Sequence, residues 1–181
     1  ASSGPKSLRL AGRVADGVLF QVGVKPTLIE YALNHIRAGA DSSGRSLEDI
    51  ELSIRLGCNV RANRTEAREA MKSYASVAAK TIFHSVPSSE IPDELEEELS
   101  TMREKYDYYE HASEEAKHRE LVTNRILDAV SVAGDPDEVT SRLKTILDFD
   151  IDRVVIPLSD VEPTRFMELF SREIMPELGT G

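Results

Sequence analysis

The residues with the clearest chemical potential open the chain, as Ser2-Ser3-Gly4-Pro5-Lys6. Proline is favoured at the first position of a helix, so Pro5 predicts that a helix begins here. A helix N-terminus offers free backbone N–H groups and a partial positive charge, and Gly4 permits close approach of a ligand. Such a loop suits the binding of a phosphate. The competing interpretation is an ordinary N-cap, which the residues alone favour because most Ser-Gly-Pro starts only cap a helix.

A second group of candidates stands at the end of a predicted strand. Asp16-Gly17 is a turn signal, and the apolar run 18–22 after it predicts a buried strand that Gly23 closes. Gln21 and Gly23 therefore lie where this strand ends. In an α/β barrel the ends of the strands form the active face, so both residues are candidates for ligand contact.

The run 50–60 is the clearest strand of the sequence, because apolar and polar residues alternate along it without a break. Ser53, Arg55 and Asn59 belong to its polar face. Arg55 could point into a binding site, or it could form an ion pair with a carboxylate of the acidic segment 83–119. Both interpretations stay open, because polarity alone does not make a site.

His111 is the remaining candidate for acid–base catalysis, and Tyr106, Tyr108 and Tyr109 precede it. These residues belong to segment 83–119, which contains prolines and is longer than an ordinary strand-to-helix loop. The segment predicts a helical insertion. A helical Tyr-Asp-Tyr-Tyr-Glu-His stretch more often supplies core contacts and a solvated face than a catalytic acid or base. His111 is therefore a weak candidate, and the other catalytic residues stay unknown.

Composition limits the classes of function. The chain has 22 Lys and Arg against 32 Asp and Glu, and the net charge of -10 disfavours nucleic acid and anionic membrane surfaces as partners. Cys58 is the only cysteine, which excludes an internal disulfide and a CxxC zinc site. No apolar stretch approaches the roughly 20 residues that span a bilayer, and the first residues do not resemble a signal peptide. We expect a cytoplasmic protein that acts on a small molecule without a metal.

The remaining chain alternates strand-like and helix-like segments, which predicts a single domain over residues 1–181. One helix is expected from Pro26 to about Gly39, and another follows a cap at Asn63 or Thr65. The last predicted elements are a helix opened by Asp135-Pro136 with Glu138 as capping-box partner, a strand over Arg153–Leu158, and an amphipathic helix with Phe166, Leu169, Phe170 and Ile174. Repeated strand–helix units indicate a parallel sheet that helices cover.

Two α/β architectures satisfy this pattern, the doubly wound sheet and the (β/α)₈ barrel. The polar face of the run 50–60 slightly favours the barrel, because a barrel lumen tolerates polar side chains near its active face.

Two stretches of the sequence resemble a known family. The opening, residues 2–18, is similar to an "SGPK-x-L-x-LAG-x-x-ADGV" stretch of luciferase-like monooxygenases and deazaflavin-dependent reductases. Residues 133–139, 142–143 and 152–155 are similar to the family's closing "G-x-P-E-E-V-x-x-R-L … G-V-D-x-V-V" pattern. The two matches bracket nearly the whole chain.

The resemblance implies the C-terminal half of a (β/α)₈ TIM barrel, because the first motif follows about the fifth strand in that family. It also implies an oxidoreductase or monooxygenase that uses coenzyme F420 or FMN and forms a homo-oligomer at full length. The residues that would contact the cofactor are Ser2, Ser3, Gly4, Pro5, Lys6, Gln21 and Gly23, the first five at its phosphate-bearing tail. Val24 replaces a basic residue that some deazaflavin-dependent sugar dehydrogenases use, and Lys25 is one position late, which argues against a sugar-phosphate substrate.

A function of another class competes with this one. A non-catalytic half-barrel could bind an anion or a partner protein through its exposed sheet edges and its insertion. Four or fewer parallel strands cannot close a barrel, so the chain alone is expected to be inactive and either marginally stable or paired.

Overall fold

The computed structural model describes residues 1–105, 121–158 and 162–179. Its α-helices are α1 (Pro5–Val14), α2 (Pro26–Asp41), α3 (Arg64–Ser85), α4 (Asp93–Lys105), α5 (Asn124–Val130), α6 (Pro136–Leu147) and α7 (Pro163–Leu169). Its strands are β1 (Gly17–Phe20), β2 (Glu51–Arg55), β3 (Gly57–Val60), β4 (Ser131–Gly134) and β5 (Arg153–Val155). Short 3-10 turns, η1 (Leu47–Asp49) and η2 (Ser88–Glu90), connect some of these elements. The helices predicted to begin at Pro5, Pro26 and Pro136 all begin there.

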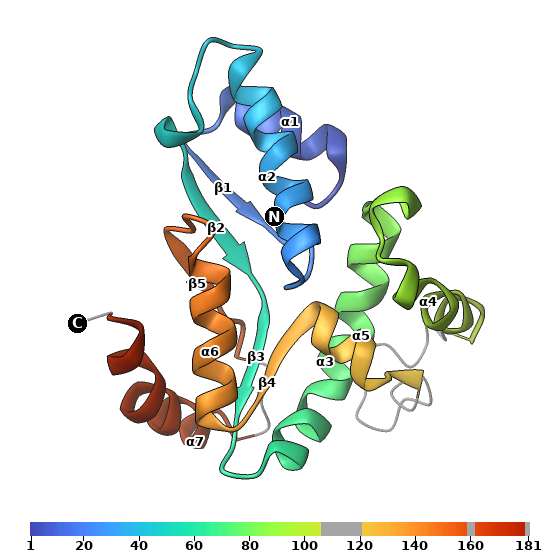
Figure 1. Cartoon of the computed structure of the whole chain (residues 1–181), viewed down its shortest axis with the longest axis vertical. Coiled ribbons are helices and arrows are strands. Elements are labelled where there is room, and N and C mark those ends of the chain that lie inside the picture. Colours follow the sequence, from blue (N-terminus) through green and yellow to red (C-terminus); the bar gives the residue numbers. More distant parts are fainter. Residues whose placement is uncertain (106–120, 159–161, 180–181) are drawn as a thin grey trace.

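The strands are parallel, as the alternation of strands and helices predicted, but they form two small sheets where one was predicted. One sheet has the order β1-β2-β5, and the other pairs β3 with β4. In the first, Phe20 is level with Ile54, and Ile54 is level with Val154. The fold is therefore α/β with parallel strands, and Figure 1 shows β2 running through the middle of the molecule.

The run 50–60, predicted as one continuous strand, is divided at Leu56 into β2 and β3. The backbone N–H of Leu56 still donates to the carbonyl oxygen of Val155 at 3.1 Å, but the next residues pair with β4 instead. The alternation of residue types is the same on both sides of the division, so it could not reveal the change of partner. The sequence also did not predict β4, because four residues are too few to show a strand period.

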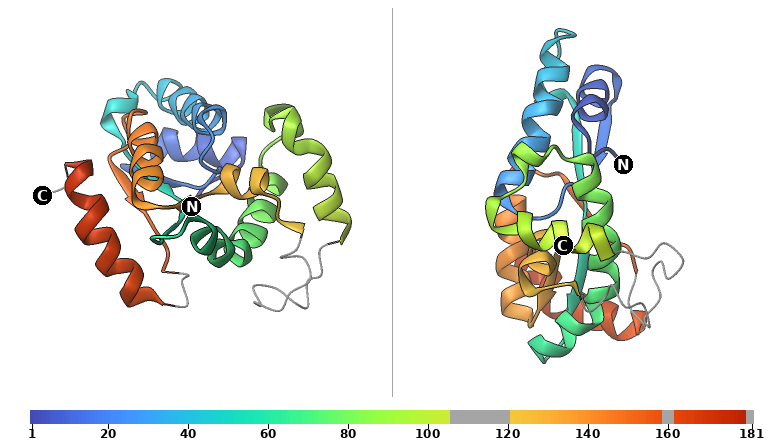
Figure 2. Two further views of the ribbon diagram at one scale, coloured as in Figure 1. Left: turned by 60° about the horizontal axis from the view of Figure 1, so that its bottom comes forward. Right: turned by 90° about the vertical axis from the view of Figure 1, so that its right-hand side faces the viewer.

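The helices pack on both sides of the strands (Figure 2). Helices α3 and α6 both contact β3 and β4, and in the right panel of Figure 2 they lie on opposite sides of these strands. One cluster of buried apolar side chains extends from Leu8 of α1 to Ile174 near the end of the described chain. The two small sheets thus share one core.

Helices α1 and α2 approach each other closely enough for their backbones to touch. A Cβ atom on Gly12 would lie 2.0 Å from the carbonyl oxygen of Ile36, and one on Gly39 would lie 2.0 Å from that of Arg9. Real atoms do not approach so closely, so both positions require glycine. The contact fixes α1, and with it the residues just before Pro5, relative to α2.

The described chain between β3 and β4 consists of helices joined by short loops. It contains α3, η2, α4 and α5, and the predicted insertion 83–119 begins inside the last turn of α3. Residues 106–120 of that segment lie outside the described residues, so the limits of the insertion stay a prediction. After β5 the predicted closing helix is found as α7, followed by a π-helical turn η4 (Phe170–Ile174) and a 3-10 turn η5 (Met175–Leu178).

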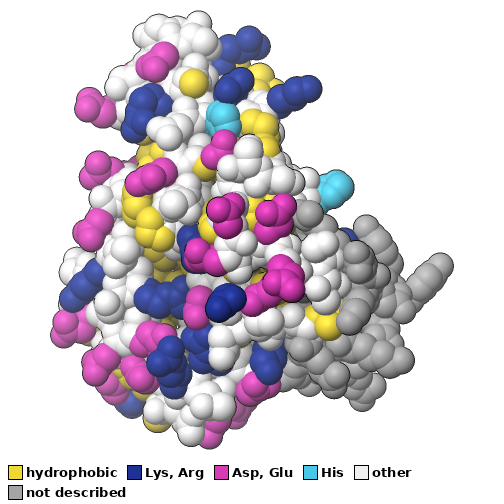
Figure 3. All heavy atoms as spheres, turned by 45° about the vertical axis from the view of Figure 1, so that its right-hand side comes forward, with side chains coloured by type: hydrophobic (Ala, Val, Ile, Leu, Met, Phe, Trp, Pro, Cys, Tyr) yellow, Lys and Arg dark blue, Asp and Glu magenta, His cyan; other side chains and the backbone are white. Residues whose placement is uncertain are grey.

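Charged side chains of both signs cover much of the face in Figure 3, and smaller hydrophobic areas show between them. Within the described ranges, every helix is too short or too polar to cross a membrane.

Candidate active site at the carboxyl ends of the strands

Ser2 occupies the place of a neighbouring strand beside β1. Its backbone N–H donates to the carbonyl oxygen of Leu19 at 2.8 Å, and its own carbonyl oxygen accepts from the N–H of Gln21 at 3.0 Å. The bridge between Ser2 and Phe20 is parallel and lies at the carboxyl end of β1. Residues 2–6, which we call the anion cradle, therefore begin at the carboxyl edge of the sheet, where ligands of α/β proteins bind.

The anion cradle leads into α1 without a side-chain cap. Gly4 is the N-cap residue, and no side chain in the described part of the chain accepts a hydrogen bond from the first turn. The Oγ of Ser7 donates to the carbonyl oxygen of Gly4 at 2.9 Å instead. The start of α1 is therefore compatible with the competing interpretation of an ordinary N-cap as well as with an anion site. Uncapped N–H groups and the helix dipole suit an anion, although the assignment of the cradle to a phosphate stays a prediction.

Side chains of α1 and α2 form a cluster that contacts the anion cradle. The hydroxyl of Tyr31 donates to the carbonyl oxygen of Ser3 at 3.2 Å, and its ring meets that of His35 edge-on. The Nε of Arg9 donates to Nδ1 of His35 at 3.2 Å. Burial, and then the charge of Arg9, lower the pKa of His35, so the imidazole stays a neutral acceptor. The cluster orients the cradle through Ser3.

Gln21 and Arg55 meet at the ends of β1 and β2. These residues directly follow the paired positions Phe20 and Ile54, and Nη1 of Arg55 donates to Oε1 of Gln21 at 2.7 Å. The sequence left open whether Arg55 would pair with an acidic residue of segment 83–119. Among the described residues its partner is the Gln21 amide, and no carboxylate of these residues lies within ion-pair distance.

The Gln21–Arg55 pair borders a cavity of about 290 Å³, which we call the Arg55 cavity. Its other lining residues all come from α3, namely Ser73, Tyr74, Val77, Ala78 and Thr81. The sequence predicted that Tyr74 belongs to an apolar helical stripe, and therefore missed it as a site residue. No local signal could have found it, because its position depends on how α3 packs against the strands.

The ring of Tyr74 lies directly against the backbone of Gly57. A Cβ atom at Gly57 would come within 2.2 Å of the ring and 2.6 Å of the Met71 side chain. The phenol oxygen of Tyr74 is buried and has no hydrogen-bond partner among the described residues. Burial raises the pKa of this phenol, against a smaller lowering by Arg55, so the hydroxyl keeps its proton and can donate.

The other predicted site residues have different surroundings. Gly23 has a φ of 97°, and a Cβ there would lie 2.5 Å from the carbonyl oxygen of Ala129, so packing explains this glycine. Ser53 and Asn59 are buried but do not line the Arg55 cavity. Lys25 forms an ion pair with Glu94 of α4, so its charge is already engaged.

His111 lies outside the described residues, so its role as a weak catalytic candidate stays a prediction. Within the described ranges, no group of three or more His, Cys, Asp or Glu side chains could hold a metal ion.

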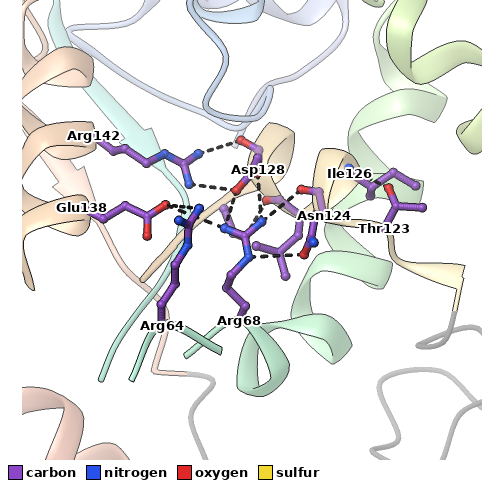
Figure 4. Close-up of polar contacts among 10 residues, drawn as sticks. Arg64, Arg68, Thr123, Asn124, Ile126, Asp128, Glu138 and Arg142 are labelled. Carbon is purple, nitrogen blue, oxygen red and sulfur yellow. Dashed lines mark hydrogen bonds and ion pairs between the residues drawn. The ribbon is translucent and has the colours of Figure 1, made fainter. Parts of the chain in front are cut away.

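A network of charged residues connects α3, α5 and α6 (Figure 4). Arg68 of α3 is only 7% exposed and contacts Asp128 of α5 at 2.9 Å and Glu138 of α6 at 3.8 Å. Arg142 of α6 donates to the backbone oxygen of Asp128 at 2.7 Å and to its carboxylate at 3.3 Å. Arg64 adds a contact to Glu138 at 3.1 Å. This network, which we call the arginine clamp, joins α3 to the segment that carries the second predicted motif.

The sequence also matches known proteins. A sequence profile of the family described as "Luciferase-like monooxygenase" matches residues 1–152. Among curated relatives, an F420-dependent glucose-6-phosphate dehydrogenase of Nakamurella multipartita is 28% identical over 178 residues, which cover 98% of this chain and 46% of the relative. A 5,10-methylenetetrahydromethanopterin reductase of Methanopyrus kandleri is 29% identical over 180 residues, which cover 97% of this chain and 48% of the relative.

The fold matches solved structures as well. The structure of the coenzyme F420-dependent tetrahydromethanopterin reductase from Methanopyrus kandleri superposes with a TM-score of 0.75 at 26% identity, covering 97% of this chain and 49% of the other. The chain thus spans about half the length of the curated relatives that it matches. With a profile match over most of its length and this structural likeness, the chain belongs to the luciferase-like monooxygenase family.

Proposed function

We propose that this chain is the C-terminal half of a luciferase-like (β/α)₈ barrel whose intact form is a flavin- or F420-dependent oxidoreductase acting on a small molecule. The observation that carries the proposal is the position of the anion cradle. The uncapped start of α1 and the Gln21–Arg55 pair belong to the same carboxyl edge of the parallel strands. Substrates and cofactors of α/β barrels bind at that edge.

The anion cradle fits a cofactor that carries phosphate. Its backbone N–H groups are uncapped, Ser2 and Ser3 add hydroxyls, and the side chain of Lys6 is exposed. Gly4 has an extended backbone with a φ of -83°, so glycine is not needed there for its conformation. A Cβ there would lie 3.3 Å from the carbonyl oxygen of Ser85, so packing against the end of α3 favours glycine, and the uncapped N–H groups support the assignment of residues 2–6 to the phosphate-bearing tail.

The bound flavin or deazaflavin would supply the electron or hydride transfer, and the protein would supply binding and orientation. In this proposal the anion cradle holds the phosphate, and the contact from Tyr31 to Ser3 keeps the cradle in place. Gln21 directly follows β1 and would approach the cofactor from the side of the Arg55 cavity. Gly23 acts indirectly, because its close contact with Ala129 shapes the loop after β1.

The cofactor choice follows the relatives. One of the two curated relatives described above is named as an F420-dependent enzyme, and the superposed structure is that of another. Both names favour F420 over FMN as the cofactor. The engaged Lys25 and the apolar Val24 still argue against a sugar phosphate as the substrate.

A charge placed in the cradle tests the proposal. Asp and Asn are both good N-cap residues, so Gly4→Asp and Gly4→Asn should retain α1, while only Asp adds a negative charge. With the intact protein, we expect F420 or FMN to bind the Asn variant at least about tenfold more tightly than the Asp variant, because the carboxylate repels the phosphate. Fluorescence titration with each cofactor measures this ratio.

Two results would contradict the proposal. If the two variants bind the cofactor with equal affinity, the anion cradle does not bind its phosphate. Failure of the wild-type protein to bind either cofactor below about millimolar concentration would leave the non-catalytic half-barrel as the better explanation.

A further inference from the structure

We propose that the Arg55 cavity binds the anionic group, a carboxylate or a phosphate, of a small organic substrate. This inference rests on the proposed function, because it places the substrate beside the cofactor held by the anion cradle.

The first argument is the charge of Arg55. Its side chain is half-buried, and its partner among the described residues is the neutral amide of Gln21, at 2.7 Å. Charged groups removed from water are usually paired with an opposite charge. In the described ranges this half-buried guanidinium has no carboxylate within ion-pair distance, and an incoming anion would supply the opposite charge.

The second argument is the orientation of the guanidinium. Gln21 accepts one hydrogen bond, from Nη1 of Arg55. The remaining N–H groups of an arginine form a rigid fork that matches the two oxygens of a carboxylate or phosphate. Because Gln21 and Arg55 follow paired positions on β1 and β2, the strands bring the two side chains together at the border of the cavity.

The third argument is independent of the charge. Tyr74 lines the same cavity, and its buried hydroxyl has no hydrogen-bond partner in the described part of the chain. A buried hydroxyl left without a partner costs free energy, which a ligand oxygen would recover. Since burial raises the pKa of Tyr74, the phenol remains a donor at neutral pH and complements an oxyanion.

The rest of the lining suits the carbon skeleton of the substrate. Val77 and Ala78 of α3 offer apolar contacts, and the Thr81 hydroxyl already donates to the carbonyl oxygen of Val77 at 3.0 Å. Ser73 remains as a further polar contact on the same helix. A cavity of about 290 Å³ accommodates a small molecule but not a polymer.

Anion binding without any cofactor tests the proposal. Acetate and inorganic phosphate are titrated into the intact protein at constant ionic strength, with ligand-detected NMR as the readout. We expect saturable binding to the wild type, at least about tenfold weaker binding to Arg55→Met, and intermediate binding to Arg55→Lys, which retains the charge but loses the planar fork. Tyr74→Phe should weaken binding by a smaller factor, because it removes one donor.

Arg37→Met is the matched control, since Arg37 is an arginine of α2 that does not line the cavity and bonds Asn34. It should bind both anions as the wild type does. Equal anion binding by wild type and Arg55→Met, or no anion binding by wild type, would overturn the proposal. A preference for acetate or for phosphate identifies the anionic group.

A cofactor titration of the same variants separates this inference from the proposed function. The affinity of Arg55→Met for F420 and FMN should fall by a much smaller factor than its affinity for anions, because Arg55 reaches the cofactor site only through Gln21. If it falls by the same factor as anion binding, Arg55 serves the cofactor and the substrate site is wrong, while the proposed function stands. If no cofactor binds the wild type but anions still bind through Arg55, the proposed function is wrong and the anion site stands.

Discussion

At the scale of single residues, two strand residues on opposite faces of β3 show what close packing demands. The side chain of Cys58 is 4% exposed, and burial raises the pKa of its thiol from 9.0 to about 12. On the other face, Gly57 leaves room for the Tyr74 ring. Gly57 thus serves the packing of Tyr74 beside the Arg55 cavity, and Cys58 serves the core on the opposite face.

Cys58 predicts a specific dependence on pH. Above pH 9 the unfolded chain loses the thiol proton while the folded protein retains it, so the unfolded state binds fewer protons. The free energy of unfolding should therefore fall as the pH rises from 9 to about 12, by up to about 1.4 kcal/mol per pH unit from this group. Urea unfolding between pH 8 and 11 should give a steeper fall for wild type than for Cys58→Ala. Parallel curves for the two proteins would disprove the assignment.

Gly57→Ala should destabilise the protein and disturb the Arg55 cavity. The new Cβ would overlap the Tyr74 ring, at 2.2 Å, and overpacking of this kind costs about 1–3 kcal/mol. Gly17→Ala is the matched control in β1, because its Cβ would meet Glu51 at an ordinary 3.5 Å. Urea unfolding compares the two variants. A Gly57→Ala protein as stable as Gly17→Ala would mean that Tyr74 does not lie against this strand.

At the scale of elements, the arginine clamp joins α3 to α5 and α6. Arg68 lies between Asp128 of α5 and Glu138 of α6, and Arg142 completes the contacts to Asp128. The residues come from three helices, of which α3 is distant in the sequence from α5 and α6 (Figure 4). Because α3 supplies most of the lining of the Arg55 cavity, the clamp also determines the shape of that cavity.

Arg68→Met should cost about 1.5–3 kcal/mol of stability, because it removes the hydrogen bonds of a nearly buried guanidinium, while Arg142 and Arg64 still pair with Asp128 and Glu138. Lys144→Met provides the control on α6. Lys144 and Glu177 are half or more exposed and 3.6 Å apart, so their pair should contribute less than about 1 kcal/mol. Thermal and urea unfolding of both variants measure the difference. Similar small losses for the two would show that the clamp does not hold α3.

At the scale of the whole molecule, the parallel sheet is open at β1. In the described chain β1 pairs with β2 on one side, and its other side meets only the single residue Ser2 (Figure 1). An open parallel edge is a site for pairing with further strands. The proposed half-barrel would close it with the strands that precede residue 2 in the intact protein.

The open edge predicts that the 181-residue chain alone associates or unfolds readily. Light scattering after size exclusion should show an apparent mass that rises with protein concentration, and thermal melting should begin in the mesophile range or below. Co-expression with the first half of the intact protein should shift the chain into a complex of constant mass. A stable monomer of the chain alone, with cooperative melting at high temperature, would contradict the half-barrel.

The sequence by itself determined the local elements. Proline at the first helical position marked the starts of α1, α2 and α6, and the apolar runs marked β1 and the long run 50–60. The two motifs also led to the family that the profile match confirmed. These features depend on residues near one another in the chain, where backbone preferences and hydrophobic periodicity act directly.

Only the tertiary structure decided which residues meet. It divided the run 50–60 between two sheets, paired Arg55 with Gln21 and placed Tyr74 over Gly57. Each of these results depends on contacts between segments 17 or more residues apart, and hydrophobic periodicity is the same whichever partner a strand or helix selects. Packing of α3 against β3 and β4 makes that selection, and with it the cavity on which the proposed chemistry depends.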